Sequence, residues 1–463
     1  MMAHATVPRV LVSATGSGVG KTTIACALMW ALGERGLRLQ ACKCGPDYLD
    51  PMFHERVLGT PSRNLDLFLG SAALVRELLA EGGRTSDLTL IEGAMGYYDG
   101  IAQGTDASAY ALADATNTPV VLVVDARGKA LSVAAEVMGF ERLRTPSHIA
   151  GVILNRATPG YYPSLKAMVE SETGVPVLGY VPRLDEAALA HRHLGLVAAE
   201  EVSDLRERIA TVGRALERTV DLDALVEVAR SAPEIAYEPV DLPEPRLERP
   251  VVAVARDRAF SFAYPDTIDL LERLGARVAY FSPLADDSLP TGTCGLYLCG
   301  GYPELHAAEL SANKRLMRSL RDAIEAGMPT IAECGGFMYL QEELEDADGR
   351  LWPMVGALAG RATRHDRLVR FGYATITARR DTLLAAAGES LCAHEFHYWD
   401  STDNGDSFHA RKPQSERSWD CVVATDALHA GFPHLYLRGN PAAAKRFVDA
   451  CVAYGARTGV PAS

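Results

Sequence analysis

Several features that would assign a function class at once are missing from this chain. Its nine cysteines include no Cys-x-x-Cys pair, so we expect no zinc or iron–sulfur site. There is no apolar run of about 18 residues and no basic-then-apolar leader, so we expect a cytoplasmic protein that does not engage a membrane. Acidic residues outnumber basic ones, 59 to 46, which disfavours nucleic acid as a partner.

The composition that is present is typical of a globular enzyme with more than one domain. The chain has 463 residues, 48% of them hydrophobic and 23% charged, which is too long for one ordinary core. In the first half, short apolar runs alternate with helical patterns, which predicts a parallel sheet with helices on both faces. The predicted strands are residues 9–13, 38–42, 88–92, 119–125, 148–154 and 177–181, and the predicted helices include 22–35 and 132–139.

A Pro- and Glu-rich segment divides the chain. Residues 231–250 contain five prolines and four glutamates, a composition typical of an extended linker. A second alternation follows, with predicted strands at 251–255, 277–281 and 295–299 and a predicted helix at 266–274. We therefore predict two α/β domains, 1–235 and 250–463, joined by a linker at 236–249.

A glycine-rich loop follows the first predicted strand and opens the first helix. Its sequence, Thr-Gly-Ser-Gly-Val-Gly-Lys-Thr-Thr from residue 15, is a variant of the phosphate-binding P-loop, with Thr15 in the place of the usual glycine. Lys21 is expected to contact the β- and γ-phosphates of ATP, and the Thr22 hydroxyl is expected to bind Mg²⁺. The predicted nucleotide contacts are Gly16, Gly18, Val19, Gly20, Lys21, Thr22 and Thr23. We expect no bound organic cofactor.

One detail of this loop separates two families of ATP-binding proteins. Partition-type ATPases carry a lysine just before the paired glycines, and this chain has Gly16 at that position. The loop is more similar to that of dethiobiotin synthetase, which activates a carboxylate. The predicted fold of the first domain is therefore a P-loop, dethiobiotin synthetase-like parallel-sheet domain.

Acidic residues follow three of the predicted strands. Because ligands of open α/β sheets bind beyond the carboxyl ends of the strands, we expect Asp47 and Glu92 to share Mg²⁺ with Thr22. Asp50 and Asp99 are as compatible with capping or turn formation as with function.

Three further residues complete the predicted site of the first domain. Asn155 ends the fifth predicted strand, where it is as well placed to read an adenine edge as to serve as an ordinary loop residue. Tyr48 precedes the helix after the second strand. We assign Tyr48, together with Asp50 and Asp99, to a substrate or acyl-phosphate site.

A cysteine in the second domain has the sequence context of a nucleophile. Cys334 lies in Glu-Cys-Gly-Gly between an apolar run, 328–332, and a helical pattern, 337–340. Such a strand-to-helix turn is a nucleophile elbow, which we expect to expose the sulfur at a helix N-terminus and to favour the thiolate. A thioester intermediate is the predicted chemistry, and a structural cysteine is the alternative.

The base for this thiol must come from a histidine elsewhere in the chain. The candidates are His394, His397, His429 and His434. Class I glutaminases have their catalytic histidine near the domain's end, which favours His434, and two residues later a glutamate that orients it. Here that later position is Tyr436, so a Cys–His dyad is expected, with another group orienting the imidazole. The oxyanion would be held by the backbone N–H groups of Gly335 and Gly301.

Taken in order, the motifs resemble the cobyrinic acid a,c-diamide synthase family over essentially the whole chain. The motifs are Gly-Pro-Asp-Tyr-Leu-Asp-Pro from 45, Glu-Gly-Ala-Met-Gly from 92, Asp-Arg-Ala-Phe-Ser-Phe from 257, Gly-Gly-Tyr-Pro-Glu from 300, Glu-Cys-Gly-Gly-Phe-Met-Tyr-Leu from 333 and His-Glu-Phe-His from 394. The resemblance implies a class I glutamine amidotransferase-like α/β second domain. It also implies a carbon–nitrogen ligase that uses ATP and L-glutamine to amidate the a and c acetates of a corrinoid in cobalamin biosynthesis.

Two alternatives to this reading stay open. The same reaction on hydrogenobyrinic acid or nickel sirohydrochlorin would use the same motifs. A partition-type nucleotide switch, from another class, is disfavoured by Gly16 and by the whole second domain. A homodimer is possible.

Overall fold

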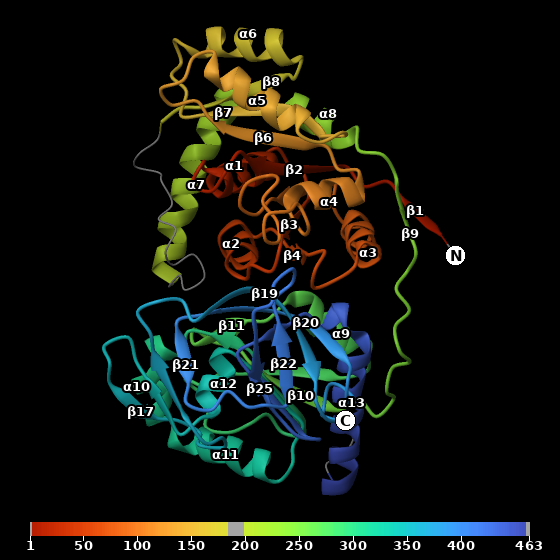
Figure 1. Ribbon diagram of the computed structural model, residues 1–463, viewed down its shortest axis with the longest axis vertical. Helices are drawn as coiled ribbons and strands as arrows, with labels where there is room; N and C mark the ends of the chain where they lie inside the picture. The colour runs from red at the N-terminus through yellow and green to blue at the C-terminus, as the bar shows by residue number, and fades with distance from the viewer. Residues whose placement is uncertain (1, 184–198, 460–463) are drawn as a thin grey trace. The chain divides into compact units, whose positions relative to one another are not determined.

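The computed structural model describes residues 2–183 and 199–459 of the chain (Figure 1). The chain divides into two compact units, Met1–Val240 and Asp241–Ser463. Each unit is built around a sheet of mainly parallel strands, and we describe each by itself. No helix in the described part of the chain is long and apolar enough to cross a membrane.

The first unit is built on a sheet whose neighbouring strands all pair in parallel. Their order is β4-β3-β5-β2-β6-β7-β8. The strands are β2 (Arg9–Ala14), β3 (Leu39–Cys44), β4 (Ser62–Leu65), β5 (Leu88–Glu92), β6 (Val120–Asp125), β7 (Ile149–Asn155) and β8 (Val177–Val181). The strand predictions are confirmed to within two residues, but β4 was not predicted. It is a short strand of mixed polarity, Ser-Arg-Asn-Leu, without an apolar pattern.

Helices connect the strands of this sheet, as a parallel sheet requires. They are α1 (Lys21–Glu34), α2 (Leu49–Leu58), α3 (Ala72–Gly83), α4 (Ala109–Thr116), α5 (Ser132–Arg142), α6 (Tyr162–Thr173), α7 (Ala199–Thr219) and α8 (Leu222–Arg230). In Figure 1, α7 runs beside α1, and the two helices pack against each other. Residues of both helices belong to the core cluster that also contains Val10 and Val121 of the sheet.

A separate two-stranded ribbon joins the start of the chain to the end of the first unit. β1 (Ala3–Ala5) pairs antiparallel with β9 (Ile235–Tyr237). The segment predicted as the linker, 236–249, therefore begins inside β9, because two of its residues pair with the start of the chain. The remainder, up to β10, has little regular structure.

The second unit has a central sheet with the order β12-β10-β13-β15-β25-β24. Its strands are β10 (Val251–Ala255), β12 (Arg277–Phe281), β13 (Thr293–Leu298), β15 (Thr330–Glu333), β24 (Val423–Ala424) and β25 (Leu428–Gly431). Only the edge strand β24 runs antiparallel. The predicted strands and the helix α9 (Pro265–Arg273) are confirmed to within two residues.

Sheets that the sequence did not predict, antiparallel except where β16 pairs with β18, make up much of the rest of the second unit. One has the order β23-β22-β19-β20-β26, another β17-β16-β18-β21, and β11 pairs with β14. The strands are β11 (Phe260–Phe262), β14 (Gly300–Gly301), β16 (Glu343–Glu345), β17 (Leu351–Pro353), β18 (Arg361–Arg364), β19 (Arg370–Ala378), β20 (Ser390–His397), β21 (Trp399–Ser401), β22 (Phe408–Arg411), β23 (Ser418–Cys421) and β26 (His434–Leu435). The helices are α10 (Ala307–Ala312), α11 (Lys314–Glu325), α12 (Gly335–Leu340) and α13 (Pro441–Thr458), with 3-10 turns η2 (Pro303–Leu305) and η3 (Leu437–Gly439).

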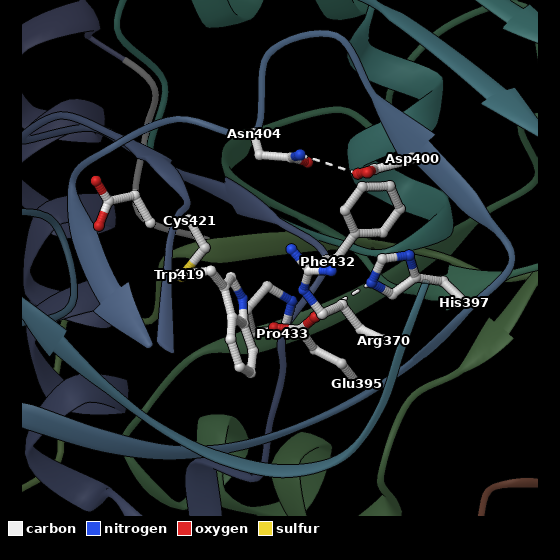
Figure 2. Close-up of a pocket in the computed structure, with 10 residues that line it drawn as sticks. Arg370, Glu395, His397, Asp400, Asn404, Trp419, Cys421, Phe432 and Pro433 are labelled. Atoms are coloured by element: carbon white, nitrogen blue, oxygen red, sulfur yellow. Dashed lines mark hydrogen bonds and ion pairs between the residues drawn. The ribbon is translucent and has the colours of Figure 1, made fainter. Parts of the chain in front are cut away.

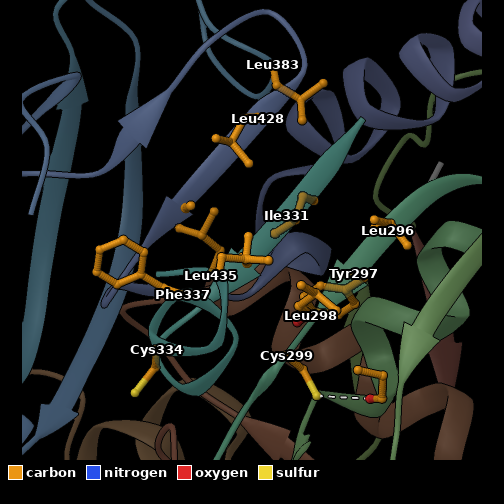
Figure 3. Close-up of a cluster of buried hydrophobic side chains, with 14 of the residues drawn as sticks. Leu296, Tyr297, Leu298, Cys299, Ile331, Cys334, Phe337, Leu383, Leu428 and Leu435 are labelled. Carbon is orange, nitrogen blue, oxygen red and sulfur yellow. Dashed lines mark hydrogen bonds between the residues drawn. The ribbon is translucent and has the colours of Figure 1, made fainter. Parts of the chain in front are cut away.

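The core of the second unit lies around its central strands. Leu296, Leu298 and Ile331 are fully buried and belong to one cluster with Phe337 and Leu435 (Figure 3). This cluster fixes the carboxyl ends of β13 and β15, and with them the two loops that carry the predicted nucleophile and oxyanion groups.

Candidate active sites

The phosphate loop of the first unit has the geometry that its sequence predicted. It connects β2 to α1, and Gly18 and Gly20 have positive φ angles of 76° and 99°, which other residues adopt at a cost. Gly20 is the N-cap of α1, so Lys21, Thr22 and Thr23 form its first turn. Backbone N–H groups at a helix start are suited to phosphate. Gly16 lies against the loop after β5, because a Cβ on Gly96 would be 3.4 Å from the Gly16 Cα.

Asn155 contacts this loop from the end of β7. Its Nδ2 donates to the Val19 carbonyl at 2.6 Å, and its Oδ1 accepts from the Arg156 N–H at 2.9 Å. Arg156 in turn donates to the carbonyl of Gly18 at 3.2 Å and to Asp125 at 2.6 Å. Asn155 therefore supports the phosphate loop, and its role in reading adenine stays a prediction.

Glu92 is the centre of the polar cluster next to the loop. It ends β5 and is fully buried. Its Oε1 accepts from Thr22 at 2.6 Å and from Lys43 at 3.0 Å, and lies 3.5 Å from the Lys21 Nζ; its Oε2 lies 3.1 Å from His54 Nε2. Burial alone would raise the pKa of the Glu92 carboxyl, but Lys43 and Lys21 hold it well below the usual value. Glu92 is therefore a carboxylate beside Lys21 and Thr22.

Lys43 and His54 belong to this cluster, and the sequence reading missed both. Lys43 is the penultimate residue of β3, is 3% exposed and forms ion pairs with Asp50 and Glu92. Burial lowers the pKa of Lys43, but Asp50 and Glu92 outweigh it and raise that pKa well above its usual value. His54, on α2, is fully buried and bridges Glu92 to the Ser62 hydroxyl at 3.1 Å on each side. Neither has a motif of its own, because both act only through the tertiary contact with Glu92.

The other acidic residues predicted for this site lie around the same cluster. Asp47 accepts from the N–H of Leu49, the first residue of α2, at 2.8 Å, and Tyr48 between them is the N-cap residue. Burial, followed by repulsion from Glu92, pushes the pKa of Asp50 upward, against the attraction of its ion-pair partner Lys43. Asp99 accepts from the N–H of Gly96 at 3.0 Å and closes the turn against Gly16. The structure thus gathers these predicted residues at the carboxyl ends of β3 and β5.

Cys334 in the second unit lies on the strained turn that its sequence predicted. It connects β15 to α12 with φ 47° and ψ −101°, a conformation rare for a residue with a side chain. Its N–H donates to the Gly431 carbonyl at 2.8 Å, which fixes the turn to the end of β25. Figure 3 shows its side chain at the margin of the core cluster, whereas Cys299 points to the Ala255 carbonyl.

The expectation of an exposed, thiolate-favouring sulfur was wrong. Cys334 is only 6% exposed. Burial, followed by the nearby Glu304 carboxyl, raises the pKa of its thiol far above the usual value, against the smaller opposing effect of the Gly335 N–H. The six-residue helix α12 does not offset this loss of solvation. The buried Cys334 thiol is therefore neutral near pH 7.

His434 and the glycine loop meet at this turn. A Cβ on Gly300 would overlap the His434 ring, and a Cβ on Gly335 would lie 2.9 Å from the Gly301 nitrogen. His434 therefore lies against Gly300, and Gly335, which follows Cys334, lies against the next residue of the same loop, Gly301. Burial lowers the pKa of His434 to about 3, so its imidazole is neutral at pH 7.

Glu333, the residue before Cys334, lies beside the His434 ring. The Glu333 Oε2 lies 3.9 Å from His434 Nδ1 and accepts from the Tyr297 hydroxyl at 3.0 Å, while Oε1 accepts from the Leu435 N–H at 3.0 Å. Burial raises the pKa of Glu333 to about 8, so near neutral pH this is a contact between neutral groups rather than an ion pair. Tyr436, at the position of the usual glutamate, donates to Asp266 at 3.0 Å instead.

The other histidine candidates have different surroundings. His429 is fully buried in β25, next to Phe408, and burial lowers its pKa to about 3. His394 lies opposite His434 in the β20–β26 pair. His397 stacks on Phe432 with ring centroids 3.9 Å apart.

Comparison with known protein families agrees with this division of the chain. A family model described as a CobQ/CobB/MinD/ParA nucleotide binding domain matches residues 10–196. A model described as a CobB/CobQ-like glutamine amidotransferase domain matches residues 251–441. The fold, the two sites and these matches define a P-loop nucleotide-binding domain followed by an α/β glutamine amidotransferase domain.

Whole-chain similarity narrows this class to one family. The chain is 40% identical over 446 residues to a cobyrinate a,c-diamide synthase of Salmonella typhimurium, covering 93% of this chain and 95% of the relative. It is 36% identical to the synthase of Caldanaerobacter subterraneus, covering 96% and 98%, and 37% identical to that of Listeria innocua, covering 94% and 97%. The chain belongs to the cobyrinate a,c-diamide synthase family and is a glutamine-dependent ligase, which confirms the resemblance drawn from its motifs.

Proposed function

We propose that this protein amidates the a and c acetate carboxylates of cobyrinic acid, with ATP and L-glutamine as co-substrates, in cobalamin biosynthesis. The observation that carries the proposal is the presence in one chain of a P-loop beside a charged cluster and of a strained turn at Cys334 that packs, through Gly335, on the glycine loop against which His434 lies. Whole-chain similarity to relatives named cobyrinate a,c-diamide synthase supports the choice of substrate.

The first half-reaction releases ammonia in the second unit. As the Cys334 sulfur forms a bond to the amide carbon of glutamine, its proton passes to the neutral imidazole of His434. The oxyanion accepts hydrogen bonds from the N–H groups of Gly301 and Gly335. When the C–N bond breaks, His434 returns the proton to the departing ammonia, and water then hydrolyses the thioester to glutamate.

The second half-reaction uses the first unit. A carboxylate oxygen of the corrinoid attacks the γ-phosphorus of ATP, ADP leaves, and ammonia replaces phosphate on the acyl carbon. Lys21 and the loop N–H groups hold the phosphates. Tyr48, Asp50 and Asp99 are the proposed residues of the acyl-phosphate or corrinoid site, and Asn155 remains the proposed adenine contact.

The donor set of the cluster fits Mg²⁺. The Thr22 hydroxyl, the Glu92 carboxylate and Asp47 supply the hard oxygen ligands that this ion prefers, and the ion would neutralise charge on the phosphates. Lys43 and His54 hold the Glu92 carboxylate in place, so the ligand is ionised before any ion arrives.

Two substitutions test whether glutamine hydrolysis belongs to the second unit and ATP-dependent amidation to the first. Cys334→Ser should abolish glutamine-driven amidation and leave ammonia-driven amidation largely intact, because only the first half-reaction needs the thiol. Lys21→Ala should remove both. Loss of both activities in Cys334→Ser would make this cysteine structural, and ammonia-driven synthesis by Lys21→Ala would refute the phosphate-loop assignment.

The substrate is tested by mass spectrometry of the products formed with ATP, Mg²⁺ and glutamine. Cobyrinic acid, hydrogenobyrinic acid and nickel sirohydrochlorin are offered in parallel. Two amidations on cobyrinic acid support the proposal. If only one of the other two macrocycles is amidated, that macrocycle is the substrate and the proposal is wrong. The same samples, run on a sizing column with light scattering, test the possible homodimer.

A further inference from the structure

The nucleophile turn is held from two sides. On one side the Gly431 carbonyl accepts the Cys334 N–H, and the two residues that follow Gly431 line the pocket shown in Figure 2. On the other side the turn packs on β14, because a Cβ on Gly335 would lie 2.9 Å from the Gly301 nitrogen. β14 pairs in turn with β11, which belongs to the motif at 257–262, and the proposed chemistry does not use this motif.

Asp257 is the hydrogen-bond centre of that motif. Its Oδ1 accepts from the N–H groups of Ala259 at 2.8 Å and Phe260 at 3.1 Å, and its own N–H donates to the Phe260 carbonyl at 2.9 Å. Its Oδ2 accepts from the Ser282 hydroxyl at 2.8 Å and the Leu284 N–H at 2.9 Å, both of which follow β12. Because hydrogen bonds to a carboxylate are stronger than neutral ones, this residue fixes the turn and ties it to the end of the neighbouring strand.

The turn at Asp257 leads directly into contact with Gly301. Phe260 lies opposite Gly301 in the β11–β14 pair, and the Tyr302 N–H donates to the Ala259 carbonyl at 2.9 Å. A Cβ on Gly301 would lie only 2.0 Å from the Ala259 oxygen, so the two backbones approach more closely than any residue but glycine allows. A shift of the turn at Ala259 would therefore move Gly301 with it.

The same contact determines which way the Gly301 N–H points. Successive N–H groups of an extended strand point to opposite sides of the strand. Because the Tyr302 N–H is used on the side of Ala259, the Gly301 N–H faces the other side, where Gly335 lies.

Phe260 connects the turn to the other predicted oxyanion group as well. Its ring centroid lies 5.3 Å from that of Tyr339 in α12, and both side chains are fully buried. α12 begins at Gly335, whose N–H is the second predicted donor. The turn therefore contacts both of the elements that carry the predicted oxyanion donors.

We propose that Asp257 is a positioning residue of the glutaminase site, which fixes the turn that holds the Gly301 N–H beside Gly335 so that both can donate to the oxyanion. The inference rests on the proposed glutaminase function of Cys334. Asp257 acts through the backbone of Ala259 and Gly301 rather than on the substrate. Donors that are fixed before the reaction stabilise the oxyanion best, because they need not reorient as the charge develops.

Asp257→Asn tests the proposal, because the amide offers one acceptor oxygen in place of two. The kcat for glutamine hydrolysis should fall by about 10- to 100-fold at unchanged KM, since misplacing a group by about 1 Å costs up to about 10²-fold. The ammonia-driven amidation rate should stay at the wild-type value.

Alkylation of Cys334 by iodoacetamide separates a positioning role from general damage to the turn. Displacement of iodide by the sulfur forms no oxyanion, so Asp257→Asn should keep the wild-type alkylation rate, measured at this cysteine by mass spectrometry. A disturbed nucleophile turn would change the alkylation rate together with kcat, and that result would overturn the proposal.

Asp346→Asn is the matched control. Asp346 holds a turn in the same unit, where it accepts from the N–H groups of Asp348 and Arg350 at 2.9 Å each and from the Trp352 indole at 2.7 Å. This turn joins β16 to β17, in a different sheet from β14. The control should lower Tm, as Asp257→Asn should, but keep the wild-type kcat.

Ser282→Ala keeps the inference testable if Asp257→Asn does not fold. It removes one donor to Asp257, so kcat should fall by about 2- to 10-fold at unchanged KM and alkylation rate, the range for one hydrogen bond. An unchanged kcat in folded Asp257→Asn, or in Ser282→Ala in its place, would overturn the inference. Wild-type protein that amidates with ammonia but does not hydrolyse glutamine would instead refute the glutaminase function itself.

Discussion

Glu333 and Cys334 are consecutive in the chain, yet their side chains have different surroundings. Cys334 occupies the strained turn, whereas Glu333 points to Tyr297, Leu435 and the Nδ1 side of His434. Because Tyr436 donates to Asp266, the position that orients the histidine in other glutaminases is unavailable for that task. We infer that Glu333 orients the His434 imidazole. The sequence predicted that some group other than residue 436 has this role but did not identify it.

Removing this carboxyl should reduce glutamine use selectively. Glu333→Leu takes away the acceptor of Tyr297 and Leu435 and the polar group beside His434, so kcat with glutamine should fall by about 10²-fold, the cost of small misplacements. KM for glutamine and the ammonia-driven rate should stay close to wild type. Glu333→Gln keeps an acceptor oxygen and should recover part of kcat. Steady-state kinetics with glutamine and with ammonium chloride measure both, and equal loss with both nitrogen sources would contradict a positioning role.

At the scale of elements, helix packing in the first unit is tight at one glycine and open at another. Gly213 of α7 faces α1 so closely that a Cβ would overlap the Trp30 ring. Gly139 of α5 has no atom within 4 Å of the place where its Cβ would be. The two residues lie inside helices of the same unit, so they form a matched pair for one substitution.

The same replacement should therefore have opposite effects at these sites. Gly139→Ala should stabilise the protein by about 0.5–1 kcal/mol, because alanine loses less chain entropy in a helix. Gly213→Ala should destabilise it by about 1–3 kcal/mol, because the Trp30 ring must move. Urea unfolding followed by circular dichroism measures both. A stabilised Gly213→Ala variant would show that α1 and α7 separate at little cost.

At the scale of the whole molecule, buried acids should make stability depend on pH. Burial raises the pKa values of Glu304 and Glu333 to about 8. The folded protein therefore binds more protons than the unfolded chain between the usual carboxyl value and about pH 8. The contribution of these groups is complete below the unfolded pKa and is lost as the pH rises through about 8.

Glu304→Gln isolates one of these contributions. Between about pH 5 and pH 8 the Tm of the variant should fall less than that of the wild type, because the amide does not ionise. Scanning calorimetry at pH 5, 7 and 8 measures the difference. Parallel pH profiles for the two proteins would contradict the buried-acid account, and Glu309→Gln, at an exposed position on α10, is the control.

The sequence predicted the parallel parts of both folds better than the antiparallel parts. Strands such as Val120–Asp125 are continuous apolar runs between helices, and that pattern is local. β19 and β20 alternate buried and partly exposed residues. Which strands they pair with cannot be read from their order along the chain. The edge strand β4 is too short and too polar to be recognised.

The sequence by itself determined the phosphate loop, the nucleophile turn, the order of the two domains and the family. These features depend on residue type at short spacing, which sets backbone conformation through local sterics and hydrophobic periodicity. Only the tertiary structure decided that Lys43 and His54 hold Glu92, that Glu333 lies beside His434, that Cys334 is buried and that the turn at Asp257 lies against Gly301. Burial and contacts between distant residues arise from the packing of sheets and helices, and no local pattern encodes them.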